Sequence, residues 1–262
     1  MRPASIYEVE KARLDSLSSS RRLAENYLEL VKRTLMGVTY RMQREIPEHV
    51  VDGRYFVAHA FTMIGRHRLD NLHARIDDVL RDGVPGDVLE AGVWRGGASI
   101  LARAVLEARG DEGRRVHVAD SFRGLPPPVH AADAAYAAIP GVNVTVLPIL
   151  AVPLEEVRDN FGRFGFADDP RVVFHEGWFR DTLPKVDGPL SVIRLDGDFY
   201  ESTTDALEAL YPKLSSGGFV LVDDYGAVPP MCGAAVDDFR RRCGIEAPLV
   251  KVDWTEVYWR KP

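Results

Sequence analysis

The sequence predicts an α/β fold in which helices cover both faces of a mostly parallel β-sheet. From Asp87 onward, short apolar runs typical of buried strands alternate with segments of helical periodicity. The chain has 262 residues, of which 46% are hydrophobic and 27% are charged, as in an ordinary soluble globular protein. This length is enough to bury the core of one large or two small α/β domains.

A polar N-terminus and two helices are predicted before the alternating region. The first residues are mostly polar and lack the apolar segment of a signal peptide. Apolar residues at helical spacing predict one helix within 22–38 and another within 66–86. We therefore divide the chain into a flexible N-terminus (1–22) and a single domain (23–262), which comprises a helical extension (23–84) and an α/β core (85–262).

Seven strands are predicted in the core. Five apolar segments read as parallel strands: 87–92, 114–120, 171–177, 190–196 and 217–224. Helices are expected between them, and the segments 248–253 and 256–261 could pair as a C-terminal antiparallel hairpin. In sheets of this kind ligands bind beyond the carboxyl ends of the strands, so the polar residues that follow each strand are the candidates for chemistry.

One connection is unusually long. Residues 123–153 are rich in proline and alanine. Connections of this length are uncommon without a function, and a lid over an active site is one usual function. A surface insertion without a catalytic role explains the composition equally well, so both interpretations stay open.

Charge and composition exclude several classes of protein. The net charge of −6 argues against a surface that binds nucleic acid. No apolar run is long enough to span a membrane, which makes a membrane partner unexpected and a cytoplasmic location the expected one. Cys232 and Cys243 provide neither a disulfide framework nor a metal-binding spacing.

The turn after the first strand is rich in glycine, in the segment VLEAGVWRGGAS. A dinucleotide fingerprint, G-x-G-x-x-G, needs a glycine where this chain has Glu90. A carboxylate at that point disfavours a pyrophosphate and suits a cationic ligand, such as the ammonium and sulfonium groups of S-adenosylmethionine. Glycine-rich turns also occur for packing alone. The pattern E-x-G-x-x-x-G-G nevertheless favours a methyl-donor site.

Two further strand ends offer groups for the adenosyl part of such a donor. Asp120 ends the second strand and could accept both ribose hydroxyls or cap a helix. Because Gly124 and a proline run follow, the ribose interpretation is favoured. Gly177 and Trp178 follow the third strand, where the indole could lie against adenine or pack in the protein interior.

Aspartates gather after the fourth and fifth strands. Asp196 and Asp198 flank Gly197, and Asp223 and Asp224 follow the next strand. If these strands are neighbours, several carboxylates converge, and they cannot all stay charged without a cation. An all-oxygen set favours Mg²⁺ or Ca²⁺ over zinc. Helix capping explains any one of these aspartates, and we expect Asp198 to have such a local role, either capping the helix that begins near Tyr200 or holding the turn.

Several segments closely resemble the macrocin O-methyltransferase (TylF-like) family: PGDVLEAGVWRGGASI, VADSFRGLP, GWFRDTLP, RLDGDFY and GGFVLVDDY. The resemblance covers roughly residues 23–260. It implies a Rossmann-like class I fold that depends on S-adenosylmethionine and Mg²⁺, with a seven-stranded sheet, extra N-terminal helices and a lid at residues 123–153. It also implies methylation of a sugar hydroxyl on an antibiotic.

The resemblance assigns roles residue by residue. It implies Asp196, Asp223 and Asp224 as metal ligands, with Asp196 also as the catalytic base. It also implies, as cofactor-binding residues, Thr62, Met63, Glu90, Gly92, Trp94, Ser99, Asp120 and Ser121. Gly177 and Trp178 join this set because they follow the third strand.

The expected function is therefore methyl transfer from S-adenosylmethionine to a hydroxyl of a small-molecule glycoside. The alternatives are a metal-dependent methyltransferase of catechols or polyphenols, a non-catalytic nucleotide-binding or scaffolding module and a dehydrogenase. The dehydrogenase is the weakest of these, because Glu90 stands where a dinucleotide fingerprint needs glycine. The apolar stripe of the first predicted helix could also pack across the interface of a homo-oligomer.

Overall fold

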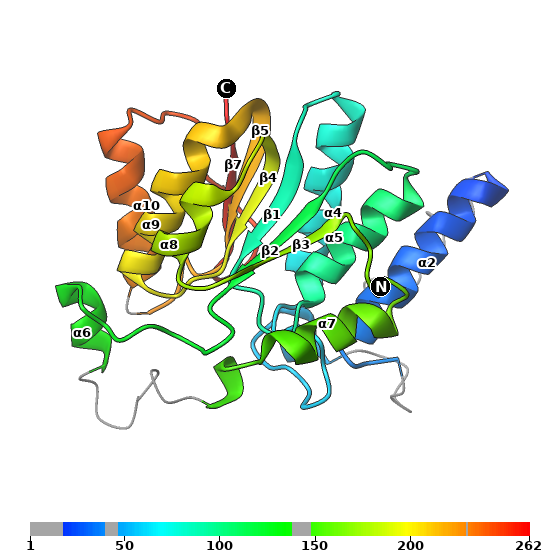
Figure 1. Ribbon diagram of the computed structural model, residues 1–262, viewed down its shortest axis with the longest axis horizontal. Helices are drawn as coiled ribbons and strands as arrows, with labels where there is room; N and C mark the ends of the chain where they lie inside the picture. Colours follow the sequence, from blue (N-terminus) through cyan, green and yellow to red (C-terminus); the bar gives the residue numbers. More distant parts are fainter. Residues whose placement is uncertain (1–17, 40–46, 138–147, 229) are drawn as a thin grey trace, which may run out of the picture.

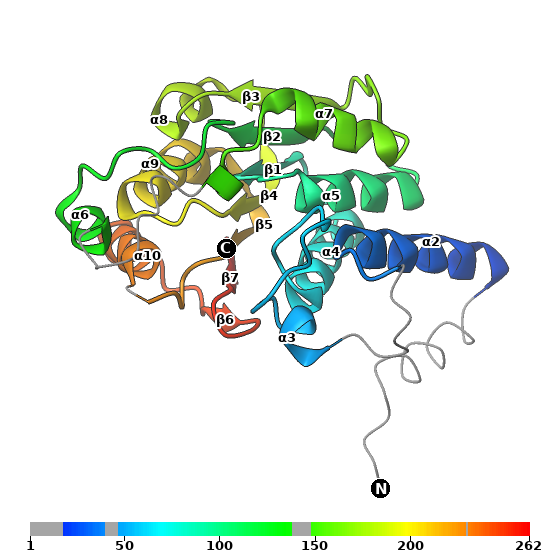
Figure 2. The same ribbon diagram turned by 90° about the horizontal axis from the view of Figure 1, so that it is seen from below.

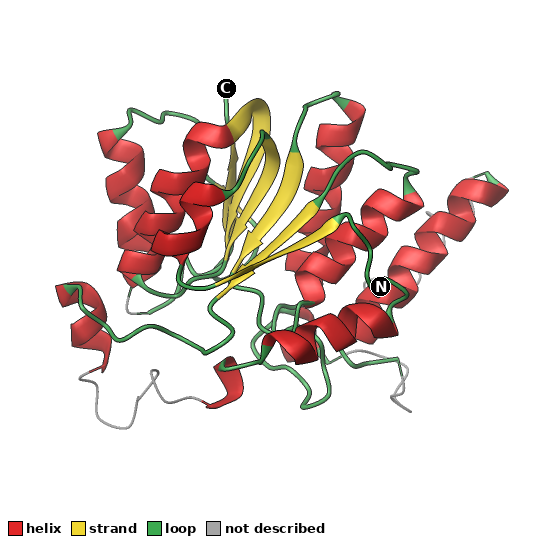
Figure 3. Cartoon of the chain, in the orientation of Figure 1, coloured by secondary structure: helices red, strands yellow, loops and turns green. Residues whose placement is uncertain are grey.

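The computed structural model describes residues 18–39, 47–137, 148–228 and 230–262. A single seven-stranded sheet stands at the centre, with helices on both of its faces (Figures 1 and 3). Its strands are β1 (Asp87–Ala91), β2 (Val116–Asp120), β3 (Val172–Glu176), β4 (Leu190–Leu195), β5 (Leu214–Val222), β6 (Val250–Lys251) and β7 (Val257–Arg260).

The strand order is β3-β2-β1-β4-β5-β7-β6. Strands β1 to β5 are parallel, whereas β7 pairs antiparallel with both β5 and β6. The predicted parallel sheet and its C-terminal hairpin are both confirmed. The chain crosses from β3 back to β4 beside β1, so the order reverses between β1 and β4, which is where ligands bind in open α/β sheets.

One face of the sheet is covered by α4 (Arg66–Arg81), α5 (Gly97–Ala108) and α7 (Leu154–Arg163), as Figures 1 and 2 show. Helix α2 (Ser19–Leu35) packs on the outside of α5. The apolar face of α2 contributes Leu28 and Leu35 to the same core as Leu72 and Ile76 of α4. The N-terminal helices therefore belong to the main core.

The opposite face is covered by α8 (Phe179–Thr182), α9 (Tyr200–Leu210) and α10 (Met231–Arg242). Its core is formed by apolar side chains of β4 and β5, and Trp259 of β7 is fully buried there. Both faces of the central strands are apolar, as expected for a parallel sheet with helices on each side.

Short elements complete the described part of the chain, among them the 3-10 helices Leu183–Lys185 and Tyr211–Lys213. Helix α3 (Glu48–Val51) precedes α4, and α6 (Ala131–Ala137) and a short 3-10 helix (Pro148–Leu150) lie within the long connection. Residues 138–147 of the predicted lid, like residues 1–17 of the predicted flexible N-terminus, fall outside the described residues. Helix α2 begins at Ser19, before the predicted domain boundary at residue 23.

Among the described residues, no helix combines the length and the apolar character needed to cross a membrane.

Candidate active site

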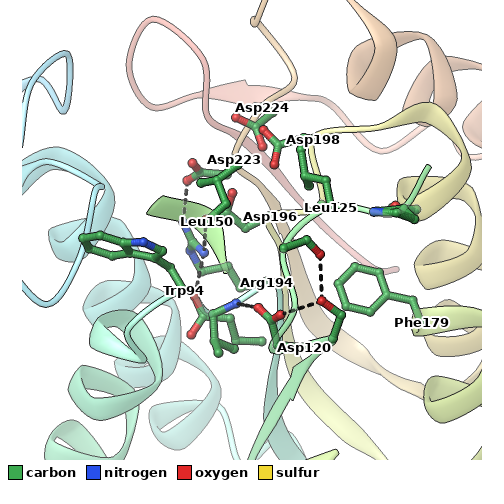
Figure 4. Close-up of a pocket in the computed structure, with 18 of the residues that line it drawn as sticks. Trp94, Asp120, Leu125, Leu150, Phe179, Arg194, Asp196, Asp198, Asp223 and Asp224 are labelled. Carbon is green, nitrogen blue, oxygen red and sulfur yellow. Dashed lines mark hydrogen bonds and ion pairs between the residues drawn. The ribbon is translucent and has the colours of Figure 1, made fainter. Parts of the chain in front are cut away.

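A cavity of about 400 Å³ opens at the carboxyl ends of β1, β2, β4 and β5. Figure 4 shows the acidic residues of the β4 and β5 ends on one side of this cavity, with Trp94 and Phe179 on opposite flanks. The segment between α3 and α4 also contributes, as do the start of the long connection and Trp254 of the β6–β7 turn. The site lies where the strand order reverses, as the sequence predicts.

Most of the predicted cofactor residues line this cavity, namely Thr62, Met63, Glu90, Gly92, Trp94, Asp120, Ser121 and Trp178. Ser99 and Gly177 do not line it. Ser99 is buried on α5 and donates a hydrogen bond to Glu90, so it acts on the cavity through that carboxylate. Gly177 donates its N–H to the Asp120 carbonyl at 2.9 Å, which ties the end of β3 to the end of β2.

The turn after β1 needs its glycines because the backbone of β4 passes very close to it. Gly92 has φ +89°, and a Cβ added there would lie 1.8 Å from the carbonyl oxygen of Asp196. Trp94 follows at φ +48°, an unfavourable conformation for a side chain of that size. The turn thus presents its backbone to the cavity, as the sequence motif predicts.

Backbone strain is concentrated around this cavity. Among the described residues, four that are not glycine have positive φ, and three of these, Trp94, Phe122 and Asp198, lie in the turns that form its wall. The fourth, Asp168, lies in a distant turn. Such conformations persist only where the surrounding structure enforces them, and they cluster at functional sites.

Asp120 holds the β1 turn against β2. Its Oδ2 accepts the backbone N–H of Val93 at 2.8 Å, and its Oδ1 accepts that of Phe122 at 2.8 Å. Burial raises the pKa of the Asp120 carboxyl, and the backbone donors oppose that shift. The carboxylate also lines the cavity, and a carboxylate oxygen can accept more than one hydrogen bond. The position is compatible with the predicted ribose contact.

Sequence reasoning missed Arg194, which lies fully buried at the centre of the acidic cluster. Its guanidinium donates to Glu90 Oε1 at 2.7 Å, to Asp196 Oδ2 at 2.9 Å and to Asp223 Oδ1. The surrounding carboxylates hold the pKa of Arg194 well above its ordinary value despite its burial. The available signal was a single arginine within the apolar strand LSVIRLD.

Glu90 is therefore already paired inside the protein. It accepts hydrogen bonds from Ser99 and Arg194, and burial raises its pKa to about 7 against the opposing effect of Arg194. The expectation that Glu90 faces a cationic ligand assumes that its carboxylate has no cationic partner within the protein. Its partners were not visible in the sequence, because Arg194 is 104 residues away along the chain.

Asp196, Asp223 and Asp224 converge as the sequence predicts, and each offers a ligand atom within 4.8 Å of the other two. Both oxygens of Asp223 accept hydrogen bonds from arginines, Arg194 and Arg68. Among the described residues, Asp224 Oδ2 is buried and has no hydrogen-bond partner. Burial and the neighbouring carboxylates raise the pKa of Asp224 well above its ordinary range. A buried, unpartnered carboxylate oxygen in an all-oxygen cluster fits a hard divalent cation.

Of the two local roles expected for Asp198, the helix cap is wrong. Helix α9 has Phe199 as its N-cap residue, and Asp133 from the long connection accepts the backbone N–H groups of Tyr200 and Glu201 instead. Asp198 has φ +56°, lines the cavity and makes no hydrogen bond within the described part of the chain. Burial, followed by repulsion from Asp196 and Asp223, raises its pKa to about 7. Figure 4 places it beside Asp224.

The family model of the Macrocin-O-methyltransferases (TylF) matches residues 47–261. The chain belongs to this family. Among curated relatives, a Streptomyces olivaceus 8-demethyl-8-(2,3-dimethoxy-alpha-L-rhamnosyl)-tetracenomycin-C 4'-O-methyltransferase is 50% identical, covering 89% of this chain and 92% of the relative. The mycinamicin III 3''-O-methyltransferase of Micromonospora griseorubida is 42% identical, covering 90% of this chain and 96% of the relative. As a TylF-family member, the protein is an O-methyltransferase.

Solved structures agree with this assignment. The O-methyltransferase NovP is 43% identical and superposes with a TM-score of 0.84, covering 91% of this chain and 99% of NovP. The calicheamicin methyltransferase CalS11 is 21% identical and superposes with a TM-score of 0.59; the match covers 90% of this chain and 91% of CalS11. The fold is that of the class I S-adenosylmethionine-dependent methyltransferases.

Proposed function

We propose that this O-methyltransferase transfers a methyl group from S-adenosylmethionine to a sugar hydroxyl of a glycosylated natural product, and that it needs a divalent cation such as Mg²⁺. The names of the relatives support the first part, since they describe enzymes that act on a rhamnosyl-tetracenomycin and on mycinamicin III. The observation that carries the proposal is the aspartate trio beside the β1 turn of this family fold.

The donor would lie over the β1 turn. The backbone of Gly92 and Trp94 and the carboxylate of Asp120 face the cavity on the side of β2, where the ribose and adenine are expected. Thr62 and Met63 also line the cavity and would hold the methionine end. The aspartates at the ends of β4 and β5 line the same cavity, so an acceptor oxygen held beside them would share one enclosure with the methyl donor.

Asp196, Asp223 and Asp224 would hold the cation, and the unpartnered Oδ2 of Asp224 supports that role. When bound, a divalent cation supplies Lewis-acid chemistry that lowers the pKa of a hydroxyl. The two arginines on Asp223 fix its carboxylate in place. They also offset the repulsion among the acids, which would otherwise oppose folding.

Two carboxylates are candidates for the base. Asp196, the sequence-based choice, is held by Arg194 at 2.9 Å and is one of the three proposed cation ligands, and a carboxylate bound to a cation is a weaker base. Without that cation, burial and repulsion from Asp223 raise the pKa of Asp196 against the opposing effect of Arg194. Asp198 lines the cavity, has no hydrogen-bond partner among the described residues and is not one of the three proposed cation ligands. With no cation bound, burial and repulsion from Asp196 and Asp223 raise its pKa to about 7. A base works best when its pKa is near the working pH. We therefore propose that Asp198 takes the proton and that Asp196 positions the acceptor.

The charge of the cavity supports an uncharged glycoside as the acceptor rather than a nucleotide-activated sugar. Two of the arginines that line it, Arg68 and Arg194, are already ion-paired with aspartates. The carboxylates of the lining outnumber the arginines, and a pyrophosphate would meet strong repulsion there. These carboxylates are Glu90, Asp120, Asp196, Asp198, Glu201, Asp205, Asp223 and Asp224.

The direct test is methylation of a panel of glycosylated antibiotics, followed by mass spectrometry. We expect a gain of one methyl group on a sugar, loss of that gain with EDTA and its return with Mg²⁺. A free catechol methylated in preference to every glycoside would overturn the acceptor assignment. Full turnover in EDTA would overturn the cation requirement.

The choice of base has its own test. Asp198→Asn should lose turnover while its affinity for S-adenosylhomocysteine and for Mn²⁺ stays near that of the unsubstituted protein. Asp196→Asn should lose turnover together with Mn²⁺ affinity. Wild-type turnover by Asp198→Asn would return the role of base to Asp196.

A further inference from the structure

The long connection between β2 and α7 is attached to the catalytic wall through one buried carboxylate. Asp133, on helix α6, is fully buried, although it lies in an alanine-rich segment. Its Oδ1 accepts the backbone N–H of Tyr200 at 2.7 Å, and its Oδ2 accepts that of Glu201 at 3.2 Å. Asp133 therefore caps helix α9 from 67 residues away along the chain.

This cap fixes a helix that begins immediately after the aspartate turn. Tyr200, the first residue of α9, comes two positions after Asp198 in the chain. The N-cap residue, Phe199, makes no side-chain cap hydrogen bond, so Asp133 supplies what the local sequence does not. A carboxylate at this position is also favoured by the positive end of the helix dipole. The backbone conformation of the Asp198 turn thus depends on a residue of another segment.

Further contacts hold the same two segments together. The His130 ring stacks on Tyr200, with ring centroids 4.1 Å apart and an interplanar angle of 8°. Leu125 packs against the small apolar cluster of Phe199 and Met231. Leu125 and His130 belong to the start of the long connection. The same stretch lines the cavity with Leu125, Pro126, Pro127 and Val129.

We propose that Asp133 is a positioning residue for catalysis. By binding the first two amides of α9, it fixes the acceptor-side wall of the cavity, residues 125–129, and the Asp198 turn relative to each other. This inference rests on the proposed function, because the turn that it positions, residues 196–198, lines the proposed methyl-transfer site. The donor side of the cavity is expected at β1, β2 and the 62–64 segment, whereas the hydrogen bonds of Asp133 within the described part of the chain go to Tyr200 and Glu201, so we do not expect cofactor binding to depend on the cap.

The test compares Asp133→Ala with Asp133→Asn and with a matched control. Asp111→Ala removes a carboxylate of the same kind, which accepts the backbone N–H groups of Gly113 and Arg114 at the turn before β2. We expect Asp133→Ala to lower kcat/KM for the acceptor about tenfold, with the affinity for S-adenosylhomocysteine within about twofold of the original. Asparagine keeps one acceptor oxygen, which can still accept the N–H of Tyr200 but not that of Glu201 as well, so Asp133→Asn should recover part of that loss. Asp111→Ala should leave kcat/KM unchanged.

Hydrogen–deuterium exchange provides a readout that does not need an acceptor. Asp133→Ala should speed exchange at the amides of Tyr200 and Glu201 about tenfold and leave the β1 turn unaffected. Unchanged exchange at these amides would show that the cap is not formed, whatever the activity. Faster exchange with unchanged kcat/KM would overturn the positioning role. If the original protein methylates no glycoside, the proposed function fails, but the exchange result still decides whether Asp133 fixes the turn.

Discussion

Two clusters of buried polar groups on the same sheet differ in how completely they are satisfied. In the first, Asp87 on β1 contacts His117 on β2 at 3.0 Å, and His117 contacts His175 on β3 at 2.9 Å. Arg115 donates its backbone and side-chain N–H groups to Asp87, so each of these side chains has a partner. In the second cluster, around Arg194, the buried Asp224 Oδ2 and Glu256 Oε2 have no partner among the described residues.

The difference separates stability from function. Buried polar groups that satisfy one another hold strands together, and they leave nothing to bind a ligand. Groups that stay unsatisfied cost folding free energy, and they persist where a ligand completes them. The Asp87 cluster is thus expected to affect stability alone, whereas the Arg194 cluster is expected to affect both stability and methyl transfer.

The largest effect is expected from Arg194→Met. This change leaves Glu90, Asp196 and Asp223 buried without their shared cation, which should cost about 3–5 kcal/mol of unfolding free energy. Chemical denaturation measures the loss. The matched control, Arg242→Met, breaks an ion pair with Glu208 in which the side chains are 59% and 52% exposed, and it should cost less than about 1 kcal/mol. Equal losses for the two variants would contradict the central role of Arg194.

Asp224→Asn should separate activity from stability. Removal of the unpartnered carboxylate should lower kcat/KM more than about a hundredfold, because a cation ligand is lost. The metal-free variant should nevertheless unfold at a denaturant concentration equal to or above that of the unsubstituted protein, because a buried acid has been neutralised. A clear loss of stability in the metal-free variant would mean that Asp224 is a structural residue like Asp87.

His175 should make the Asp87 cluster sensitive to acid. Burial, followed by repulsion from His117, lowers the pKa of His175 to about 4. The unfolded chain takes up a proton near its ordinary pKa of about 6.5, before the folded protein does, so stability falls as the pH falls from about 6.5 to 4. The loss in that window should be about 2–3 kcal/mol, and His175→Gln should reduce it. Denaturation curves at several pH values measure this, and an unchanged slope would contradict the assignment.

Asp87→Asn should have the smallest effect. It removes the charge that pairs with Arg115 and His117, and a loss of about 1–2 kcal/mol of unfolding free energy is expected. The kcat/KM for methyl transfer and the affinity for S-adenosylhomocysteine should both stay unchanged. A tenfold fall in kcat/KM with normal cofactor binding would mean that the two clusters are coupled through the sheet.

The sequence predicted the sheet and the aspartate trio well because both depend on local patterns. Apolar strands that end in acids mark the carboxyl edge of the sheet, and Asp196, Asp223 and Asp224 meet there once β4 and β5 are neighbours. The partners of Glu90 and Asp198 were harder to predict. Glu90 is paired by Arg194 from β4, and the capping role given to Asp198 is filled by Asp133 from the long connection.

These misses share a physical cause. A hydrogen bond between residues 67 or 104 positions apart leaves no periodic pattern in the sequence. The sequence therefore did not reveal that Glu90 is paired in the fold, or that Asp133 rather than Asp198 caps helix α9. Local propensity also misled the prediction for Asp198, since an aspartate immediately before a helix is a common cap, whereas α9 begins one residue later than that role requires. Its φ of +56° turns it away from that role and toward the cavity.

Binding of Mn²⁺, followed by electron paramagnetic resonance in the presence of S-adenosylhomocysteine, tests the central claim most directly. We predict one bound ion per chain in the unsubstituted protein, with binding lost in Asp224→Asn and retained in the matched Asp87→Asn variant. Equal Mn²⁺ binding by Asp224→Asn and the unsubstituted protein would contradict the claim that Asp196, Asp223 and Asp224, at the ends of β4 and β5, form a cation site that the unpartnered Oδ2 of Asp224 helps to complete.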